Sequence, residues 1–300
     1  MAEPNYALML DCWLPDSGRH PRYGTNMLFD SAATPSGKAN LSLVAPAVMD
    51  QNLVGACVGH GGACAVTTAF CAAGQPLFGF DAQGFPVSIS QRDGYGGARC
   101  IDLMLDGLPN TTQLTDSGTE VLSVIRFYAE WGFRKTDAPM VAVDPDTGES
   151  YGLVNSDCVP ANCNDKPVFG ELEQDSLKLV PRAHQITSVG AQRITDVCLS
   201  LDAKCPVVIG TFVDSAFLAY KGGTVIGAQN TNDPRGGGHC MCLIGYETQA
   251  DGSRVFLLRN SWGTSWGNNG DAWVSEAFVK QMLELFAVSA KPAASIKEAA

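Results

Sequence analysis

The chain has 300 residues, of which 45% are hydrophobic and 17% are charged, and its formal net charge is −11. A chain of this length and apolar content can bury a sizeable core, so intrinsic disorder is excluded for most of it. Nucleic-acid binding proteins normally present clustered Lys and Arg, and no such cluster occurs in this acidic sequence. We therefore expect no nucleic acid among its partners.

A long uncharged stretch raises the question of a membrane segment. No charged residue occurs between Asp50 and Asp81, a gap long enough to span a bilayer. The gap contains six glycines and several polar residues, and its apolar positions never run unbroken for the roughly 18 residues that a spanning helix needs. The stretch therefore predicts a buried core segment and no membrane partner.

The number and spacing of the cysteines indicate the redox state of the compartment and whether a metal site is expected. Eleven cysteines are present, an odd number in a chain far larger than disulfide-stabilised scaffolds. No Cys-x-x-Cys pair with nearby histidines occurs, so we expect neither a metal nor another cofactor. The N-terminus lacks a basic region followed by an apolar stretch, which argues against a secretory signal. We expect free thiols in the cytoplasm or another reducing compartment, of a bacterium or a virus.

The first two thirds of the chain favour helices. Residues 1–49 are rich in proline and glycine and predict an irregular segment that packs on the body or joins its sheet. Small and apolar residues over 55–73 predict a helix, whose glycines indicate that another element approaches it closely. Apolar spacing predicts further helices over 118–133 and 191–203. The polar stretch 134–182 between them is expected to be an elaborated surface loop.

The last third favours strands separated by Gly, Asn and Asp clusters. The expected strands are 206–213, 223–228, 239–246, 254–260 and 271–275. A last helix is predicted over 275–287, followed by a flexible tail at 289–300. This order predicts an α+β protein with two lobes, a helical lobe over 50–200 and a β-rich lobe over 201–288.

Three residues of different types stand in settings that suit nucleophilic catalysis. Cys57 lies in the first turn of the glycine-rich helix, where the helix dipole favours thiolate and free N–H groups can receive an oxyanion. His239 follows three glycines at the entrance of a strand. Asn260 carries a neutral amide, which orients an imidazole without adding a competing negative charge. Taken singly, these residues also fit a buried thiol, a structural histidine and a tight turn.

His60 is the alternative histidine. It lies three residues after Cys57 in the same predicted helix, where neighbours three apart can touch. A base in the nucleophile's own helix is poorly placed for a substrate between them. We therefore favour His239.

The order Gln51, Cys57, His239, Asn260 resembles that of the papain-like cysteine peptidases. The stretch Asp50-Gln51 to Gly55-Ala56-Cys57 is similar to the family's nucleophile segment, and Gly238-His239 to Gly245-Tyr246 is similar to its histidine strand. The most specific segment is Asn260-Ser261-Trp262-Gly263, followed by Trp266-Gly267. The similarity extends over about 50–280 with a divergent middle, and the short N-terminal part is closer to bacterial and viral members than to lysosomal ones.

The resemblance implies a fold, a reaction and a set of roles. The fold would be papain-like, with a helical lobe, an antiparallel barrel-like lobe and the active site in the cleft between them. Cys57 would be the nucleophile, His239 the base and then the acid, and Asn260 the residue that orients its imidazole. Gln51 would donate to the oxyanion, and a polypeptide would be the substrate. Shielding of the His–Asn pair and contact with substrate would fall to Trp262, Gly55 and Gly238.

The chain departs from the family's pattern at several points. Val54 and Val58 replace a cysteine and an aromatic residue around the nucleophile, and loss of that cysteine removes a disulfide partner. His239 and Asn260 follow Cys57 by 182 and 203 residues, more than the family's roughly 130–150. The 56 residues before Cys57 look irregular, so no helical inhibitory propeptide is expected.

We expect a thiol-dependent peptidase that works through a thioester. Two alternatives stay open: a catalytically silent binding or structural module, and a transpeptidase or amidase that uses the same site. The sequence does not determine the oligomeric state or the peptide bonds that fit.

Overall fold

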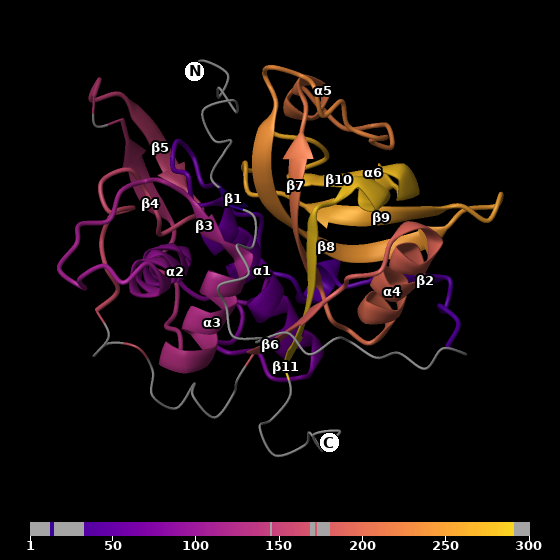
Figure 1. The fold of residues 1–300 in the computed structure, drawn as a ribbon, viewed down its shortest axis with the longest axis horizontal. Coiled ribbons are helices and arrows are strands. Elements are labelled where there is room, and N and C mark those ends of the chain that lie inside the picture. Colours follow the sequence, from indigo (N-terminus) through magenta and orange to yellow (C-terminus); the bar gives the residue numbers. More distant parts are fainter. Residues whose placement is uncertain (1–12, 15–32, 145, 169–171, 173–180, 291–300) are drawn as a thin grey trace.

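The computed structural model describes residues 13–14, 33–144, 146–168, 172 and 181–290. A helical part and a sheet part lie side by side, with α1 running between them (Figure 1). The helices are α1 Cys57–Ala72, α2 Gln91–Leu105, α3 Val121–Trp131, α4 Gly190–Asp202, α5 Ser215–Leu218 and α6 Glu276–Gln281, with a 3-10 turn at Ser42–Val44. Within these ranges, every helix falls short of the length and hydropathy needed to cross a bilayer.

A seven-stranded antiparallel sheet forms the second part of the molecule. Its strands follow the order β10-β9-β8-β7-β11-β6, and β2 pairs with β8 outside that path. The sheet strands are β2 Lys38–Asn40, β6 Pro181–Gln185, β7 Val207–Val213, β8 Gly237–Thr248, β9 Arg254–Arg259, β10 Asp271–Ser275 and β11 Glu284–Ala290. The remaining strands are β1 Trp13–Leu14 parallel to β3 Thr119–Glu120, and the hairpin β4 Met140–Val143 with β5 Ser150–Val154.

Helix α1 is buried on nearly every side and joins the two parts. It packs against α2 and α3 on one side and against β8 and β11 on the other. Glycine permits both approaches. A Cβ on Gly59 would lie 2.8 Å from the carbonyl oxygen of Gln91, and one on Gly61 would lie 2.9 Å from the sulfur of Cys240. The glycines in the predicted helix therefore mark two close contacts, as expected from the sequence.

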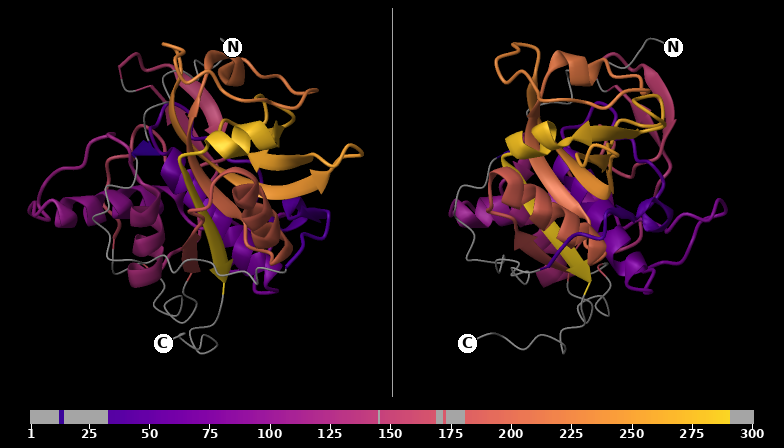
Figure 2. Two further views of the ribbon diagram at one scale, coloured as in Figure 1. Left: turned by 45° about the vertical axis from the view of Figure 1, so that its right-hand side comes forward. Right: turned by 90° about the vertical axis from the view of Figure 1, so that its right-hand side faces the viewer.

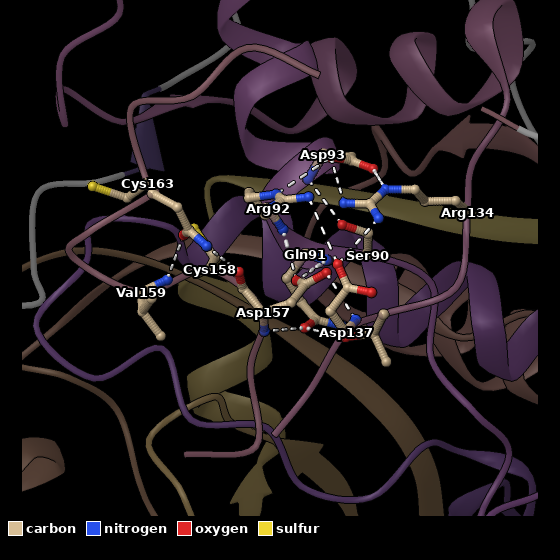
Figure 3. Close-up of polar contacts among 12 residues, drawn as sticks. Ser90, Gln91, Arg92, Asp93, Arg134, Asp137, Asp157, Cys158, Val159 and Cys163 are labelled. Atoms are coloured by element: carbon tan, nitrogen blue, oxygen red, sulfur yellow. Dashed lines mark hydrogen bonds and ion pairs between the residues drawn. The ribbon is translucent and has the colours of Figure 1, made fainter. Parts of the chain in front are cut away.

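Helix α2 has no counterpart among the predicted elements, because three glycines and several charges obscure its periodicity. Ser90 caps it by accepting the N–H of Asp93, and Asp157 of a distant loop accepts the N–H groups of Gln91 and Arg92 at 2.9 and 3.0 Å. Figure 3 shows this carboxylate pointing at the start of the helix. Long-range capping thus supports a helix that local sequence does not suggest.

Other elements differ from those predicted because strand pairing in the sheet outweighs the local hydrophobic pattern of the sequence. The helix predicted over 275–287 is wrong in its second half, because α6 ends at Gln281 and β11 then fills the place between β7 and β6. Residues 223–228 form no strand and make only an isolated bridge from Ile226 to Val274. The predicted loop 134–182 contains the hairpin of β4 and β5.

The sheet recruits residues from outside the predicted β-rich range. β2 comes from the N-terminal segment and pairs with β8. β6 precedes residue 201 and α4 begins before it, yet β6 pairs with β11 and α4 packs on β2, β7, β8 and α6. In the predicted tail, residues 289–290 belong to β11, and residues 291–300 lie outside the described residues.

Candidate active site

Cys57 is the first residue of α1, and its side chain is completely buried. The preceding Ala56 provides no side-chain cap, so the first N–H groups of the helix have no such partner. Burial raises the pKa of the Cys57 thiol well above its usual value, and the neighbouring Cys240 raises it further. Hydrogen bonds from the N–H groups of Cys240 and Val58 act in the opposite direction. The sulfur of Cys57 is thus held against the peptide that follows His239.

His239 lies on β8, opposite Thr211 of β7. Its Nε2 is 2.8 Å from Oδ1 of Asn260, which as an amide oxygen accepts, so Nε2 carries the proton in this pair. The imidazole stacks on the ring of Trp262 with centroids 4.5 Å apart. Among the described residues, Nδ1 of His239 has no hydrogen-bond partner, although it is buried. Nδ1 is therefore the ring nitrogen left to exchange a proton.

Burial also sets the charge state of this histidine. It lowers the pKa of His239 to about 4, while the hydrogen bond to Asn260 raises it and the nearby His60 lowers it. Burial thus favours the neutral forms of both the Cys57 thiol and the His239 imidazole. Entry of water or substrate polar groups would relieve the desolvation and favour the thiolate–imidazolium pair.

Gln51 links the nucleophile segment to the asparagine segment. Its Nε2 donates to the carbonyl of Val54 at 2.9 Å, and its Oε1 accepts the hydroxyl of Ser261 at 2.6 Å. Its backbone N–H also donates to the Ser261 carbonyl at 2.8 Å. The amide is fully buried and fixed in orientation, with one Nε2 hydrogen remaining for another acceptor.

Gly55 and Gly238, the two glycines named from the sequence, take part through their backbone groups. Gly238 lies in β8 opposite Phe212, directly before His239. Gly55 donates its N–H to the carboxylate of Asp116, at 2.9 Å to Oδ2 and 3.1 Å to Oδ1. Asp116 was not expected from the sequence, because no motif marks the loop before β3.

His60 is engaged elsewhere. Its Nδ1 lies 2.8 Å from the carbonyl of Ala56, and its Nε2 lies 2.9 Å from the hydroxyl of Ser156. Burial lowers the pKa of His60 to about 4. Both ring nitrogens are therefore used in the structure of the helical part, which agrees with the preference for His239.

The short strand β1 bridges the two parts of the molecule. It pairs in parallel with β3, and it also contacts β8. Thr119 and Glu120 of β3, which pair with it, are buried at 0% and 2% exposure. In the described ranges, no group of three His, Cys, Asp or Glu side chains is arranged to hold a metal ion.

Comparisons with known proteins agree on one family. Residues 148–283 match the model of the papain family cysteine proteases, a little under half of the chain. A senescence-specific cysteine protease of Oryza sativa is 44% identical over 57 residues, covering 19% of this chain and 16% of that protein. Cysteine proteinase 3 of Entamoeba histolytica is 25% identical, covering 47% of this chain and 54% of that protein. The chain thus spans less than two thirds of the length of these relatives.

Solved structures extend the likeness to almost the entire chain. Xylellain, a cysteine protease from Xylella fastidiosa, matches with a TM-score of 0.64 at 20% identity, covering 93% of this chain and 95% of that one. A procathepsin B from Trypanosoma congolense matches with a TM-score of 0.62 at 15% identity, covering 95% and 88%. At such identities the likeness concerns the fold. Residues 148–283 thus match the papain family model and nearly the whole chain has the papain-like fold, which confirms the resemblance expected from the sequence.

Proposed function

We propose that the chain is a thiol peptidase that hydrolyses peptide bonds through Cys57, His239 and Asn260. The observation that carries the proposal is the hydrogen bond between Nε2 of His239 and Asn260, which leaves Nδ1 without a partner among the described residues. The next residue of the same strand, Cys240, donates its N–H to the sulfur of Cys57. The match of residues 148–283 to the papain family model supports a thiol peptidase.

The reaction begins when Nδ1 of His239 takes the thiol proton of Cys57. The thiolate then attacks the carbonyl carbon of a peptide, and the resulting oxyanion accepts hydrogen bonds from Nε2 of Gln51 and the N–H of Cys57. His239 returns the proton to the departing amine as the C–N bond breaks, leaving a thioester. Water, deprotonated by His239, breaks the thioester, releases the acid and restores the thiol.

Trp262 and Asn260 keep the imidazole ready for both proton transfers. Stacking of Trp262 on His239 excludes water from the His239–Asn260 hydrogen bond. The amide of Asn260 is neutral, so it orients the ring without opposing formation of the Cys57 thiolate. Nε2 keeps its proton on Asn260, so both proton transfers of the reaction take place at Nδ1.

The test is hydrolysis of an unfolded protein substrate by the full chain, followed by mass analysis of the products. We expect peptides bearing one added water at each cut, and loss of at least 10³-fold in turnover for Cys57→Ala. Cys64→Ala, a thiol two turns further along α1, serves as the control and keeps its activity. Products joined to an added amine would indicate a transpeptidase. Equal turnover by the Cys57→Ala protein and the unmodified chain would refute the proposal. If neither the unmodified chain nor any variant hydrolyses the substrate, a catalytically silent module is favoured.

A further inference from the structure

The loop that precedes the nucleophile is anchored by a carboxylate. Both oxygens of Asp116 accept the N–H of Gly55, two residues before Cys57, at 2.9 and 3.1 Å. Asp116 lies in the segment between α2 and β3, 61 residues further along the chain. The bond therefore ties the nucleophile segment to a different region of the helical part.

Tyr95 of α2 fixes the carboxylate in turn. Its hydroxyl donates to Oδ1 of Asp116 at 2.6 Å and accepts the N–H of Gly118 at 3.1 Å. The ring is fully buried, and the guanidinium of Arg99 lies 3.7 Å from its centroid. A Cβ on Gly59 would lie 2.9 Å from Cβ of Tyr95, so the same tyrosine also packs against α1 two residues after Cys57.

The contacts therefore hold both flanks of the nucleophile. Tyr95 packs on the residue two positions after it, and through Asp116 it fixes the peptide two positions before it. Val54 of the same loop, at a position where the family carries a disulfide cysteine, packs instead with Tyr95, Cys158 and Cys163. The anchoring of the loop in this chain is thus polar rather than covalent.

We propose that Asp116, oriented by Tyr95, is a positioning residue for Cys57 in the peptidase reaction. The inference rests on the proposed function. Because the N–H of Cys57 is expected to receive the oxyanion, a fixed Gly55 peptide holds that donor in place. The negative charge of Asp116 has an opposing effect, since it disfavours the thiolate. The carboxylate thus aligns the nucleophile while restraining its ionisation.

Several charged or titratable groups among the described residues act on the thiols and the tyrosine of this site. Cys57 is influenced by Cys240 of β8 and by Asp116, while Asp116 also acts on Cys158 and Cys163. Arg99 is the positive charge acting on Tyr95 and on those two thiols. Replacing Asp116 therefore removes a carboxylate whose charge raises the pKa of the Cys57 thiol.

The experiment separates the tether from the charge. Asp116→Ala loses both, whereas Tyr95→Phe keeps the charge and loosens the tether, and exposed Asp146→Asn removes one equivalent charge from the tip of the β4–β5 hairpin as a control. Hydrogen exchange of the Gly55 amide, measured by NMR, is expected to accelerate at least tenfold in Asp116→Ala and less in Tyr95→Phe. Unchanged exchange in Asp116→Ala would overturn the tether whether or not the chain is a peptidase.

Kinetics test the positioning role. We expect kcat to fall about tenfold in Asp116→Ala with KM nearly constant, and the acid limb of the kcat/KM profile to move to lower pH because a negative charge has gone. Tyr95→Phe should lower kcat without that shift. If Asp116→Ala matches Asp146→Asn in kcat and in pH profile, Asp116 has no role in positioning. If Cys57→Ala retains turnover, the proposed function fails and the exchange result still decides the tether.

Discussion

Gln51 and His60 are both fully buried polar side chains of the nucleophile segment, yet their partners give them different roles. Gln51 spans from the Val54 carbonyl to the Ser261 hydroxyl, so its amide connects the helical part to the asparagine segment. His60 spans from the Ala56 carbonyl to Ser156 within the helical part. The first arrangement suits an oxyanion donor, and the second suits a structural residue.

If Gln51 donates a hydrogen bond to the oxyanion, as we propose, its removal should slow the reaction. Gln51→Ala should lower kcat/KM by roughly 10²–10³, the usual loss for one oxyanion donor. Ser261→Ala is the matched control, because it removes the partner of Oε1 and leaves the Nε2 donor in place. Steady-state kinetics on one peptide substrate would measure both. Equal losses in the two variants would show that the Gln51–Ser261 bond matters and the donor does not.

The buried histidines make stability depend on pH. His60 has a folded pKa of about 4 against roughly 6.5 when unfolded, so the unfolded chain binds more protons between these values. The free energy of unfolding should therefore fall as pH drops from about 6.5 to about 4, by up to about 3 kcal/mol from this residue. Asp93, whose pKa burial raises to about 6, acts in the opposite direction.

The comparison with a variant isolates the contribution of His60. His60→Gln keeps a donor near Ser156 and keeps Asp93, so the slope of unfolding free energy against pH should become smaller between pH 6.5 and 4. Urea unfolding at a series of pH values measures it. Parallel curves for the two proteins would contradict the burial-induced shift.

The contact between His239 and Asn260 could be predicted from the sequence, whereas the contacts that support the site could not. Cys57, His239 and Asn260 stand in local motifs, and the structure brings His239 and Asn260 into hydrogen-bond contact. Asp116 and Ser156 act through bonds to groups far along the chain, and nothing beside them in sequence marks that use. Such contacts arise from tertiary folding and leave no periodic pattern.

At the scale of elements, glycine allows the helices to pack more closely than larger residues would. Gly97 of α2 faces the ring of Phe127, and Gly94 faces the hydroxyl of Tyr128, both of α3. The same glycines weaken the helical pattern of α2 in the sequence, which is why α1 and α3 could be predicted and α2 could not. β11 was missed for a related reason, since its pairing with β7 and β6 is long-range.

This packing leads to a stability prediction. A Cβ on Gly97 would lie 2.2 Å from the Phe127 ring, so Gly97→Ala should destabilise the fold by roughly 1–3 kcal/mol through overpacking. That cost exceeds the gain of up to about 1 kcal/mol in helix propensity. The control is Gly227→Ala, where nothing lies within 4 Å and φ is not positive. Denaturant unfolding measures both, and a more stable Gly97→Ala protein would contradict the prediction.

At the scale of the molecule, β1 joins the helical part to the sheet while the candidate site lies buried. Figure 2 shows from two further directions how the sheet part and the helical part lie against each other. β1 contacts one element of each part, β3 and β8. Because β1 contacts β8, whose Cys240 amide bonds the Cys57 sulfur, loosening β1 is expected to loosen the surroundings of the thiol.

The prediction concerns the accessibility of the thiol. Leu14→Pro removes a backbone donor and fixes φ, which weakens the pairing of β1 with β3, so Cys57 should react faster with iodoacetamide. Leu14→Ala keeps the backbone donor and is expected to react at nearly the original rate. Mass spectrometry of the labelled peptide measures the rates. Identical rates in all three proteins would show that β1 does not control access.

Strand β8 contributes two groups near the thiol of Cys57. The strand supplies His239 and, through the next amide, a hydrogen bond to the sulfur of Cys57. A small separation of β8 from α1 would therefore take away both this amide donor and the imidazole that we propose as the proton acceptor of the sulfur. If the chain is a peptidase, a molecule in which β8 is displaced from α1 would therefore lose its activity completely and would not keep a reduced rate.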